Sequence, residues 1–270
     1  MKIHTTNYTY RKFVNAAEVA KPAKGVFRHS VKSSVSFAGF NMNEALEKAR
    51  KGWDAGIKEL EIKNNLFSGV GTNIRPSFRG TRVNMGAYLK GDPRNMYKRV
   101  GYADYNRERV TVFVPLSYHG GIKVKQALKV AKVYIKIVNN LQINYDVKIV
   151  GVYYSKKHGK NDDEVINVNI TLKEFDDRLV INNIAMAFHP AFFRRLIFKY
   201  REQYDFCAIA SYAGSASEVS NLINDKLINE NDRNIILKPV DDVYITNEDA
   251  IKRSCLHSKN KIDFKPINII

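Results

Sequence analysis

The chain has few cysteines and no long hydrophobic run, and both absences narrow its class. Cys207 and Cys255 are the two cysteines of the sequence, too few for a disulfide framework or a cysteine-based zinc cluster. No apolar run approaches the roughly 20 residues that span a bilayer. The first ten residues also lack the apolar core of a signal peptide. We therefore expect a soluble protein of a reducing cytoplasm, without membrane insertion.

Catalytic signatures are missing as well. The phosphate-binding pattern G-x-x-x-x-G-K-[ST] does not occur, and Gly69-Val70-Gly71 lacks the third glycine of a dinucleotide fingerprint. The six histidines are not paired at helical spacing, and Cys207 lies in an apolar stretch that disfavours a reactive thiolate. His189, which precedes Pro190, is expected to start a helix rather than to act as a general base. The sequence thus predicts a non-catalytic protein without a cofactor.

Acidic residues are scarce relative to basic ones. The chain carries 44 Lys and Arg against 27 Asp and Glu, a net charge of +17. Residues 1–105 contain 19 basic and 8 acidic side chains, so they hold most of that excess. A charge of this size favours a polyanionic partner. Such a partner is nucleic acid or an anionic membrane surface, and we expect nucleic acid; an acidic partner protein is the further alternative.

Hydrophobic runs and helical periodicity predict the α/β class. Strands are predicted over residues 110–116, 146–154, 165–172 and 235–240. The short polar connection before residue 165 favours an antiparallel hairpin. Helices are predicted over residues 43–61, 122–141, 190–204, 215–229 and 246–256. Alternating strands and helices favour a three-layer sandwich with a mostly parallel sheet in residues 106–270.

Residues 1–105 read as a basic N-terminal region in front of that α/β domain. It combines the helix over residues 43–61 with a Gly- and Arg-rich segment that is expected to be irregular. Within this segment, residues 86–93 are expected to form a short helix that ends at Gly91 and Pro93. The sequence does not decide whether this region folds by itself or elaborates the sheet.

Several short motifs are similar to known sequences. They are SFAGF at residues 36–40, ARKGWDAG at 49–56, GAYLKGDPRNM at 86–96 and HPAFFRRLIF at 189–198. These segments resemble a family of uncharacterised phage-encoded proteins. Residues 110–154 resemble the opening β-α-β unit of a von Willebrand factor A-like domain. The resemblance implies a phage protein with that α/β fold, located in the cytoplasm of the infected host cell or in the virion.

The resemblance to A-type domains fails at their metal site. Those domains end the first strand with D-x-S-x-S, whose oxygen atoms hold a divalent cation. The corresponding residues 114–120 read VPLSYHG and contain no carboxylate, so we expect no metal there. A-type domains also imply that this end of the sheet binds other proteins. For a protein-interaction role, the contact surface would be Ser117, Tyr118 and His119.

Two groups of basic residues are candidates for phosphate contact. In the first, four lysines recur at intervals of 4, 3 and 4 and so share one helix face: Lys125, Lys129, Lys132 and Lys136. A solvated helix face is the alternative interpretation, although residues 111–145 contain no Asp or Glu to balance the lysines. The second group lies in the Gly-rich segment among tyrosines and would also suit a subunit interface: Arg75, Arg79, Arg82, Arg94 and Arg99.

A third candidate, Arg194 with Arg195, lies among phenylalanines in residues 192–198. Arginine forks bind phosphates, and exposed aromatic rings stack on unpaired bases. Alternatively, the aromatic rings face the core and the arginines lie outside. Together with the phage origin that the resemblance implies, these features predict an accessory protein of phage transcription, replication or genome handling. It would bind DNA or RNA through Lys and Arg with little sequence readout. The alternative is a protein-interaction or virion structural component that docks on an acidic partner protein of the phage or host.

Overall fold

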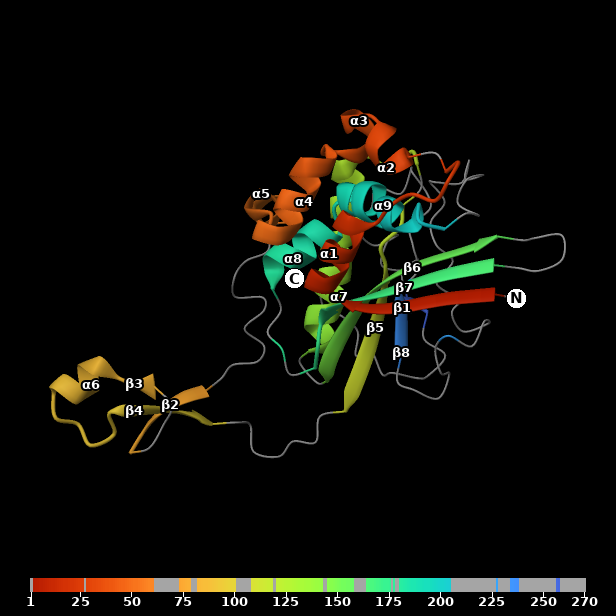
Figure 1. Ribbon diagram of the computed structural model, residues 1–270. Coiled ribbons are helices and arrows are strands. Elements are labelled where there is room, and N and C mark those ends of the chain that lie inside the picture. The colour runs from red at the N-terminus through yellow and green to blue at the C-terminus, as the bar shows by residue number, and fades with distance from the viewer. Residues whose placement is uncertain are drawn as a thin grey trace.

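The computed structural model of this chain consists of a main α/β body and a small β-sheet that projects from it (Figure 1). The α/β class predicted from the sequence is confirmed. The structure describes residues 2–26, 28–60, 73–78, 82–100, 108–118, 120–142, 145–157, 164–175, 177, 180–204, 227, 234–237 and 256–257.

The main sheet has four long strands in the order β1-β7-β6-β5, extended by the short strands β8 and β9. Strand β1 (Lys2–Thr9) runs parallel to β7 (Glu164–Lys173), and β6 (Asp146–Lys157) runs antiparallel to β7. The predicted hairpin is therefore confirmed. Strand β5 (Arg109–Pro115) is parallel to β6 and to β8 (Asn234–Leu237), whereas β9 (Leu256–His257) is antiparallel to β8. The described sheet is thus mixed.

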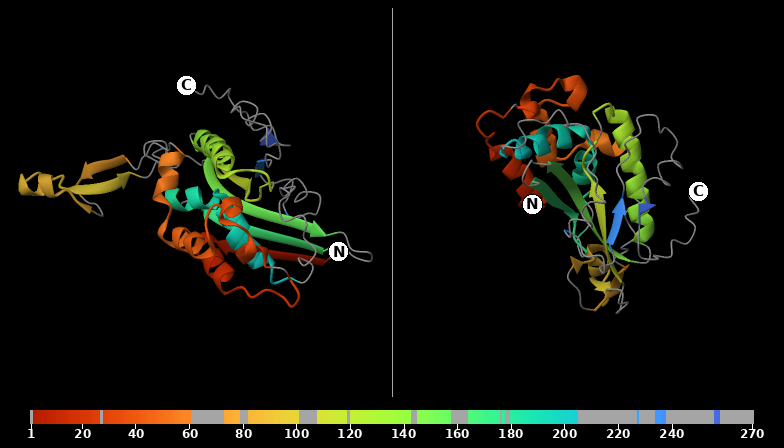
Figure 2. Two further views of the ribbon diagram at one scale, coloured as in Figure 1. Left: turned by 90° about the horizontal axis from the view of Figure 1, so that it is seen from above. Right: turned by 90° about the vertical axis from the view of Figure 1, so that its right-hand side faces the viewer.

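The two faces of the sheet belong to two hydrophobic clusters. Because side chains alternate along a strand, Val112 and Val114 of β5 face one way and Phe113 the other. The first cluster also holds the buried residues of the helices, which gather on that face (Figures 1 and 2). The described residues therefore form two layers. The helices predicted over residues 215–229 and 246–256 lie outside the described residues, apart from Leu227 and Leu256, and Leu256 belongs to β9.

The helical layer forms because each helix presents an apolar face to the sheet. Helix α1 (Tyr10–Val19) buries Tyr10, Phe13, Val14 and Ala17. Helix α7 (Val124–Leu141) connects β5 to β6, as predicted. After β7 come α8 (Ile181–Ala187), the π-helical segment η2 (Phe192–Ile197) and α9 (Phe198–Arg201). All six residues of η2 are buried, so this segment forms the centre of the layer.

The predicted helix over residues 43–61 is wrong as a single element. After α2 (His29–Lys32) and α3 (Val35–Ala38), the chain forms α4 (Met42–Lys51) and α5 (Asp54–Glu59). A capping box between Asn41 and Glu44 starts α4. Gly52 ends it with a φ of 97°, and Trp53 is buried beyond the break. The left-handed φ suits glycine, and Gly52 also lies directly against Asn182 of α8.

The described residues 73–78 and 82–100 form the projecting unit, which we call the arm. Strands β2 (Asn73–Ser77) and β3 (Arg82–Val83) both pair antiparallel with β4 (Met96–Val100). Between β3 and β4, helix α6 (Met85–Leu89) forms the far end of the arm (Figures 1 and 2). The prediction of an irregular segment is therefore wrong here, because its polar strands pair with one another. The short helix predicted over residues 86–93 corresponds to α6.

Residues 2–60 belong to the main body. All eight residues of β1 pair with β7, from Lys2 beside Glu164 to Thr9 beside Thr171. Helix α4 contacts η2, and α5 contacts α8. Strand β1 was not predicted from the sequence; its half-buried side chains, such as Thr6 and Tyr8, alternate with exposed ones. The basic N-terminal region thus supplies an edge strand and part of the helical layer, in addition to the arm.

Candidate nucleic-acid interface

Arg195 lies in the core, which overturns its assignment as a phosphate contact. Its side chain is 2% exposed. The guanidinium donates hydrogen bonds to the carbonyl oxygens of Phe40 (2.8 Å), Ser30 (2.8 Å) and Ser34 (3.3 Å). Burial lowers the pKa of Arg195. The guanidinium therefore uses its N–H groups to hold residues 30–40 against η2, and it does not point to solvent.

Arg194 has the same kind of structural role and is likewise 2% exposed. It donates to the carbonyl oxygen of Phe37 and to that of Ile122 at 2.8 Å, and it lies over the Phe37 ring at 4.1 Å. Burial lowers the pKa of Arg194 to about 10, so it stays charged at neutral pH. The aromatic rings around it face the core, but the arginines do so too, and the predicted phosphate contact of this cluster is wrong.

His189 starts the buried helical segment, as the sequence analysis expects. Its Nδ1 accepts a hydrogen bond from the backbone N–H of Ala191 at 3.0 Å. The ring stacks on Phe40 with centroids 4.3 Å apart and meets the edge of Trp53 at 4.6 Å. Burial, with smaller contributions from Arg194 and Lys48, lowers the pKa of His189 to about 3. The imidazole is therefore neutral at physiological pH and serves packing.

The loop after β5 does not offer the predicted protein-contact surface. Ser117 is 2% and Tyr118 is 4% exposed. The Tyr118 hydroxyl donates to the carbonyl oxygen of Phe188 at 2.8 Å, and burial raises the pKa of that hydroxyl. His119 lies outside the described residues. The assignment of Ser117 and Tyr118 as contact residues is thus wrong, because both pack inward against the helical layer.

The lysine stripe of α7 is only partly exposed. Lys125 and Lys129 are exposed, whereas Lys132 and Lys136 are half-buried and each has a polar or electrostatic partner. The buried residues of α7, such as Leu128, Ala131 and Tyr134, lie on the other sides of the helix, away from the lysine stripe. The two N-terminal lysines therefore remain candidates for phosphate contact, and the two C-terminal ones are already used within the fold.

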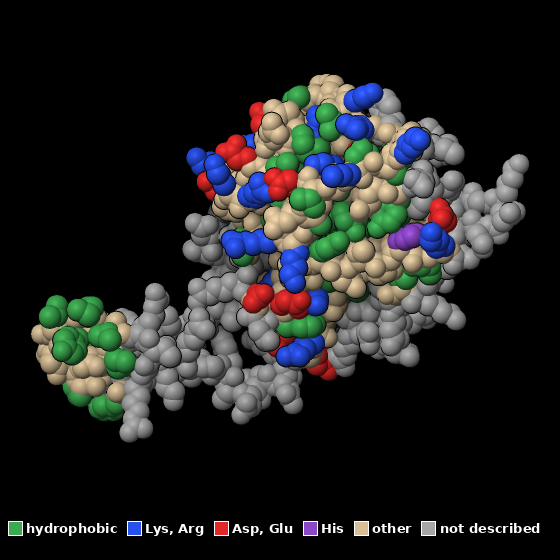
Figure 3. Space-filling model, viewed as in Figure 1, with side chains coloured by type: hydrophobic (Ala, Val, Ile, Leu, Met, Phe, Trp, Pro, Cys, Tyr) green, Lys and Arg blue, Asp and Glu red, His purple; other side chains and the backbone are tan. Residues whose placement is uncertain are grey.

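The segment between α1 and α2 carries a further basic surface that was not predicted from the sequence. Lys21, Lys24 and Arg28 are exposed in the segment between α1 and α2. Residues 19–43 contain no Asp or Glu. By contrast, two basic residues at the C-terminal end of α4 are paired, Arg50 with Glu18 and Lys51 with Glu47. Figure 3 shows Lys and Arg spread over this side of the body, with acidic side chains beside only some of them. Counting the acid-free interval would have found this surface.

The arm gathers the arginines that the sequence analysis selected from the Gly-rich segment. Residues 73–100 contain seven Lys and Arg against one acidic residue, Asp92. The backbone register places Arg75 opposite Lys98 and Arg82 opposite Tyr97. Arg99 lies in β4 next to Lys98, and Arg94 is exposed just before β4 begins. Arg79 lies outside the described residues. The sheet thus concentrates basic residues on one projecting element.

Asp92 offsets only one of these positive charges, and it also shapes the turn after α6. Its carboxylate accepts a hydrogen bond from the Arg94 backbone N–H at 2.8 Å and lies 4.0 Å from the Arg94 guanidinium. Gly91, with a φ of 72°, allows the Asp92 N–H to reach the carbonyl oxygen of Ala87 at 3.0 Å. At the other end of α6, the Asn84 side chain accepts from the Ala87 N–H. The end of the arm is therefore a defined structure.

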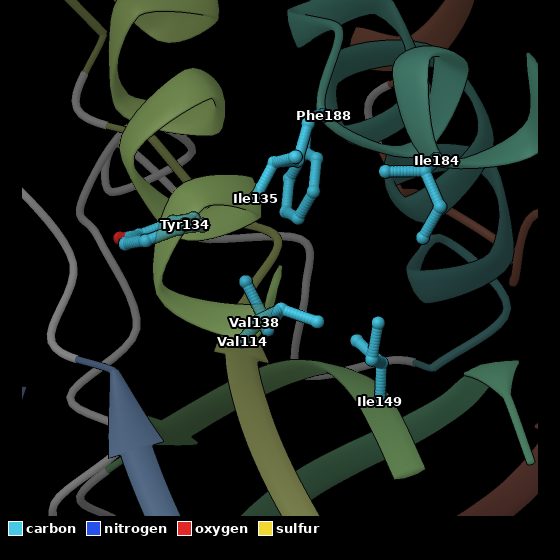
Figure 4. Close-up of a pocket in the computed structure, with 7 residues that line it drawn as sticks. All are labelled: Val114, Tyr134, Ile135, Val138, Ile149, Ile184 and Phe188. Atoms are coloured by element: carbon cyan, nitrogen blue, oxygen red, sulfur yellow. The ribbon is translucent and has the colours of Figure 1, made fainter. Parts of the chain in front are cut away.

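A small cavity between α7, α8 and the sheet has apolar walls and suits packing rather than chemistry (Figure 4). Seven residues line it: Val114, Tyr134, Ile135, Val138, Ile149, Ile184 and Phe188. Within the described ranges, no three His, Cys, Asp or Glu side chains gather in a way that could hold a metal ion. No described helix combines the length and hydrophobicity needed to cross a membrane. The basic surfaces are thus the strongest candidate site.

Comparison with known proteins places the chain in a family and assigns it no activity. The model of the family described as "Domain of unknown function (DUF7192)" matches residues 3–263. No curated protein and no solved structure matches the chain. The family description names neither a phage origin nor an A-type domain. Because the match spans nearly the whole sequence, main body and arm alike, the chain belongs to the DUF7192 family.

Proposed function

We propose that this protein binds nucleic acid, with the arm as its principal contact surface. One observation carries the proposal: the described residues of the arm, 73–78 and 82–100, include six basic residues and a single acidic one. Phosphates attract such a surface at long range, and each neutralised phosphate releases counterions. The exposed Lys125 and Lys129 of α7 and the basic segment between α1 and α2 would extend the contact.

The binding mode follows from the type of side chain. Lysine and arginine neutralise phosphates without reading the bases, so this part of the affinity is independent of sequence and sensitive to salt. If about four arm cations contact phosphates, log K should fall with log salt at a slope of about −3 to −4. We propose an accessory role in the transcription, replication or genome handling of a phage, in the cytoplasm of the infected cell.

The finer fold assignment is part of the same proposal. The parallel unit β5-α7-β6 is the arrangement with which an A-type domain opens, and we propose a von Willebrand factor A-like, three-layer architecture on that basis. A role as a protein-interaction or virion component is the second candidate. It is favoured by the charge of the arm, which would equally suit an acidic partner protein.

The test compares two charge-reversed variants of equal charge. Lys90→Glu with Arg94→Glu changes two exposed residues of the arm, and Arg11→Glu with Lys12→Glu changes two exposed residues of α1. We would measure fluorescence anisotropy of labelled single-stranded DNA, duplex DNA and RNA over a salt series. The arm variant should lower affinity and reduce the magnitude of the salt slope by about 1.5 to 2.

The control variant on α1 should retain most of the affinity. Equal losses in both variants would contradict the assignment to the arm, because they would report total charge alone. Failure of the wild-type protein to bind any of the three probes at low salt would refute the proposed function. The second candidate would then be tested by co-purification with phage and host proteins.

A further inference from the structure

The far end of the arm exposes large apolar side chains. Met85, Tyr88 and Leu89 of α6 are 61%, 58% and 78% exposed, and Phe78 and Val83 beside them are 69% and 48% exposed. Figure 3 shows hydrophobic side chains gathered at the end of the arm, away from the main body. We call these five residues the tip. A contiguous apolar patch of this kind usually marks a binding surface.

The tip is presented by a fixed backbone. Met85, Tyr88 and Leu89 follow the spacing i, i+3, i+4, which places them on one face of α6. Asn84 caps the start of this helix, and the turn at Gly91 closes its end. The Asn84 N–H also donates to the carbonyl oxygen of Asn95 at 2.8 Å, which joins the two sides of the arm. The apolar face of α6 is therefore held away from the arm's own strands.

We propose that the tip contacts the bases of the bound nucleic acid, with Met85, Tyr88 and Leu89 packed against base faces that are exposed or partly unstacked. This inference rests on the proposed function and adds a base-contacting element to it. Proteins that grip phosphates with basic residues often insert apolar side chains between base steps, and aromatic rings stack on unpaired bases. The arm combines both features, because its strands carry basic residues and its tip is apolar.

Charge selects nucleic acid over a second copy of the chain as the partner of the tip. Each chain carries +17, so docking a basic arm on another copy would bring like charges together. An anionic bilayer would also attract the arm. However, polar residues flank the apolar residues of the tip in the sequence: Asn84 precedes Met85, and the exposed Lys90 and Arg94 follow Leu89. Grooves and splayed bases, where apolar faces adjoin phosphates and polar edges, accommodate such a mixture.

The test separates base contact from phosphate contact. In the tip variant, Met85→Ser, Tyr88→Ser and Leu89→Ser remove the apolar face of α6 without changing charge. The control, Ile3→Ser with Val180→Ser, makes the same kind of change at body positions outside the proposed contact surfaces, which are 39% and 50% exposed. Leu89→Ser alone is a milder second variant. Circular dichroism and thermal unfolding would establish that each variant folds like the wild type.

The probes are DNA single strands and duplexes that contain 2-aminopurine, a fluorescent base that brightens when it is unstacked. The tip variant should bind about 10- to 100-fold more weakly than the wild type, because base stacking and wedging contribute about 1–3 kcal/mol per contact. Its salt slope should match that of the wild type, since no charge is lost. Wild-type protein should raise 2-aminopurine fluorescence, the tip variant should not, and the control variant should behave as the wild type.

The other outcomes overturn the inference in distinguishable ways. If the tip variant binds and unstacks like the wild type, the bases are not contacted by the tip, and the proposed function stands. If the wild type binds no probe, the proposed function falls together with the inference. A third outcome is unchanged DNA binding of the tip variant together with a loss that the control variant does not show. Loss of binding to phosphatidylglycerol vesicles would make the tip a membrane contact, and loss of self-association in light scattering would make it a subunit contact.

Discussion

Replacing Arg195 by alanine should destabilise the protein severely without acting on nucleic acid directly. The guanidinium donates to three backbone carbonyl oxygens, those of Ser30, Ser34 and Phe40, and the side chain is 2% exposed. Removing one side of a buried charged network typically costs about 3–5 kcal/mol, because the remaining polar groups lose their partners. In a body of this size, that loss corresponds to a Tm decrease of roughly 10 °C.

The assay is urea unfolding followed by circular dichroism, with Arg11→Ala on the exposed surface of α1 as the control for loss of one positive charge. Arg195→Lys adds a second comparison, since it keeps the charge but loses the planar fork that reaches three acceptors. We expect Arg195→Lys to lose a large part of the same stability and Arg11→Ala to lose less than about 0.5 kcal/mol. If Arg195→Ala unfolds like the wild type but binds nucleic acid more weakly, the core role of Arg195 is refuted.

Three further predictions follow from the same contacts. Burial holds the pKa of His189 at about 3, so below pH 6.5 the unfolded chain takes up a proton that the folded chain excludes. The free energy of unfolding, measured with urea, should therefore fall by about 2 kcal/mol between pH 7 and pH 5. The variant His189→Asn should lack this part of the pH dependence. Gly39→Ala should cost about 2 kcal/mol or more in the same assay, since φ is 89° and the new Cβ would lie 2.6 Å from the His189 ring; Gly25→Ala, also at positive φ but in open space, should cost less. Lys125→Glu with Lys129→Glu should lower nucleic-acid affinity by about tenfold at low salt and leave unfolding unchanged; unchanged affinity in anisotropy titrations would remove α7 from the interface.

The strands and helices that the sequence predicted well have strong local signals. Strands β5, β6 and β7 are apolar and β-branched over most of their length, and α7 has apolar residues at helical spacing over 18 positions. Each of these elements packs in the main hydrophobic cluster. For such segments, the residue pattern and the tertiary environment agree, so the pattern alone locates the element within a few residues.

The elements that were missed depend on partners far away in the sequence. Strand β1 is polar and becomes a strand because β7, more than 150 residues later, pairs with it. Arg194 and Arg195 resemble surface residues in the sequence, and only the carbonyl oxygens of residues 30–40 and 120–122 make their burial possible. The arm was read as irregular because its strands are short and rich in Arg, Asn and Gly. The exposed tip had no sequence signal, since Met85, Tyr88 and Leu89 equally fit a buried helix face.

The central claim, that the arm contacts nucleic acid, is tested most directly by ultraviolet cross-linking of the wild-type protein to a labelled single strand, followed by mass spectrometry of the linked peptides. Aromatic residues within bonding distance of a base form such links, and the arm holds Phe78, Tyr88 and Tyr97. We predict that the linked peptides derive from residues 73–100, with Tyr88 or Phe78 at the attachment point. Links that map only to the main body, or no links under conditions of saturated binding, would contradict this account.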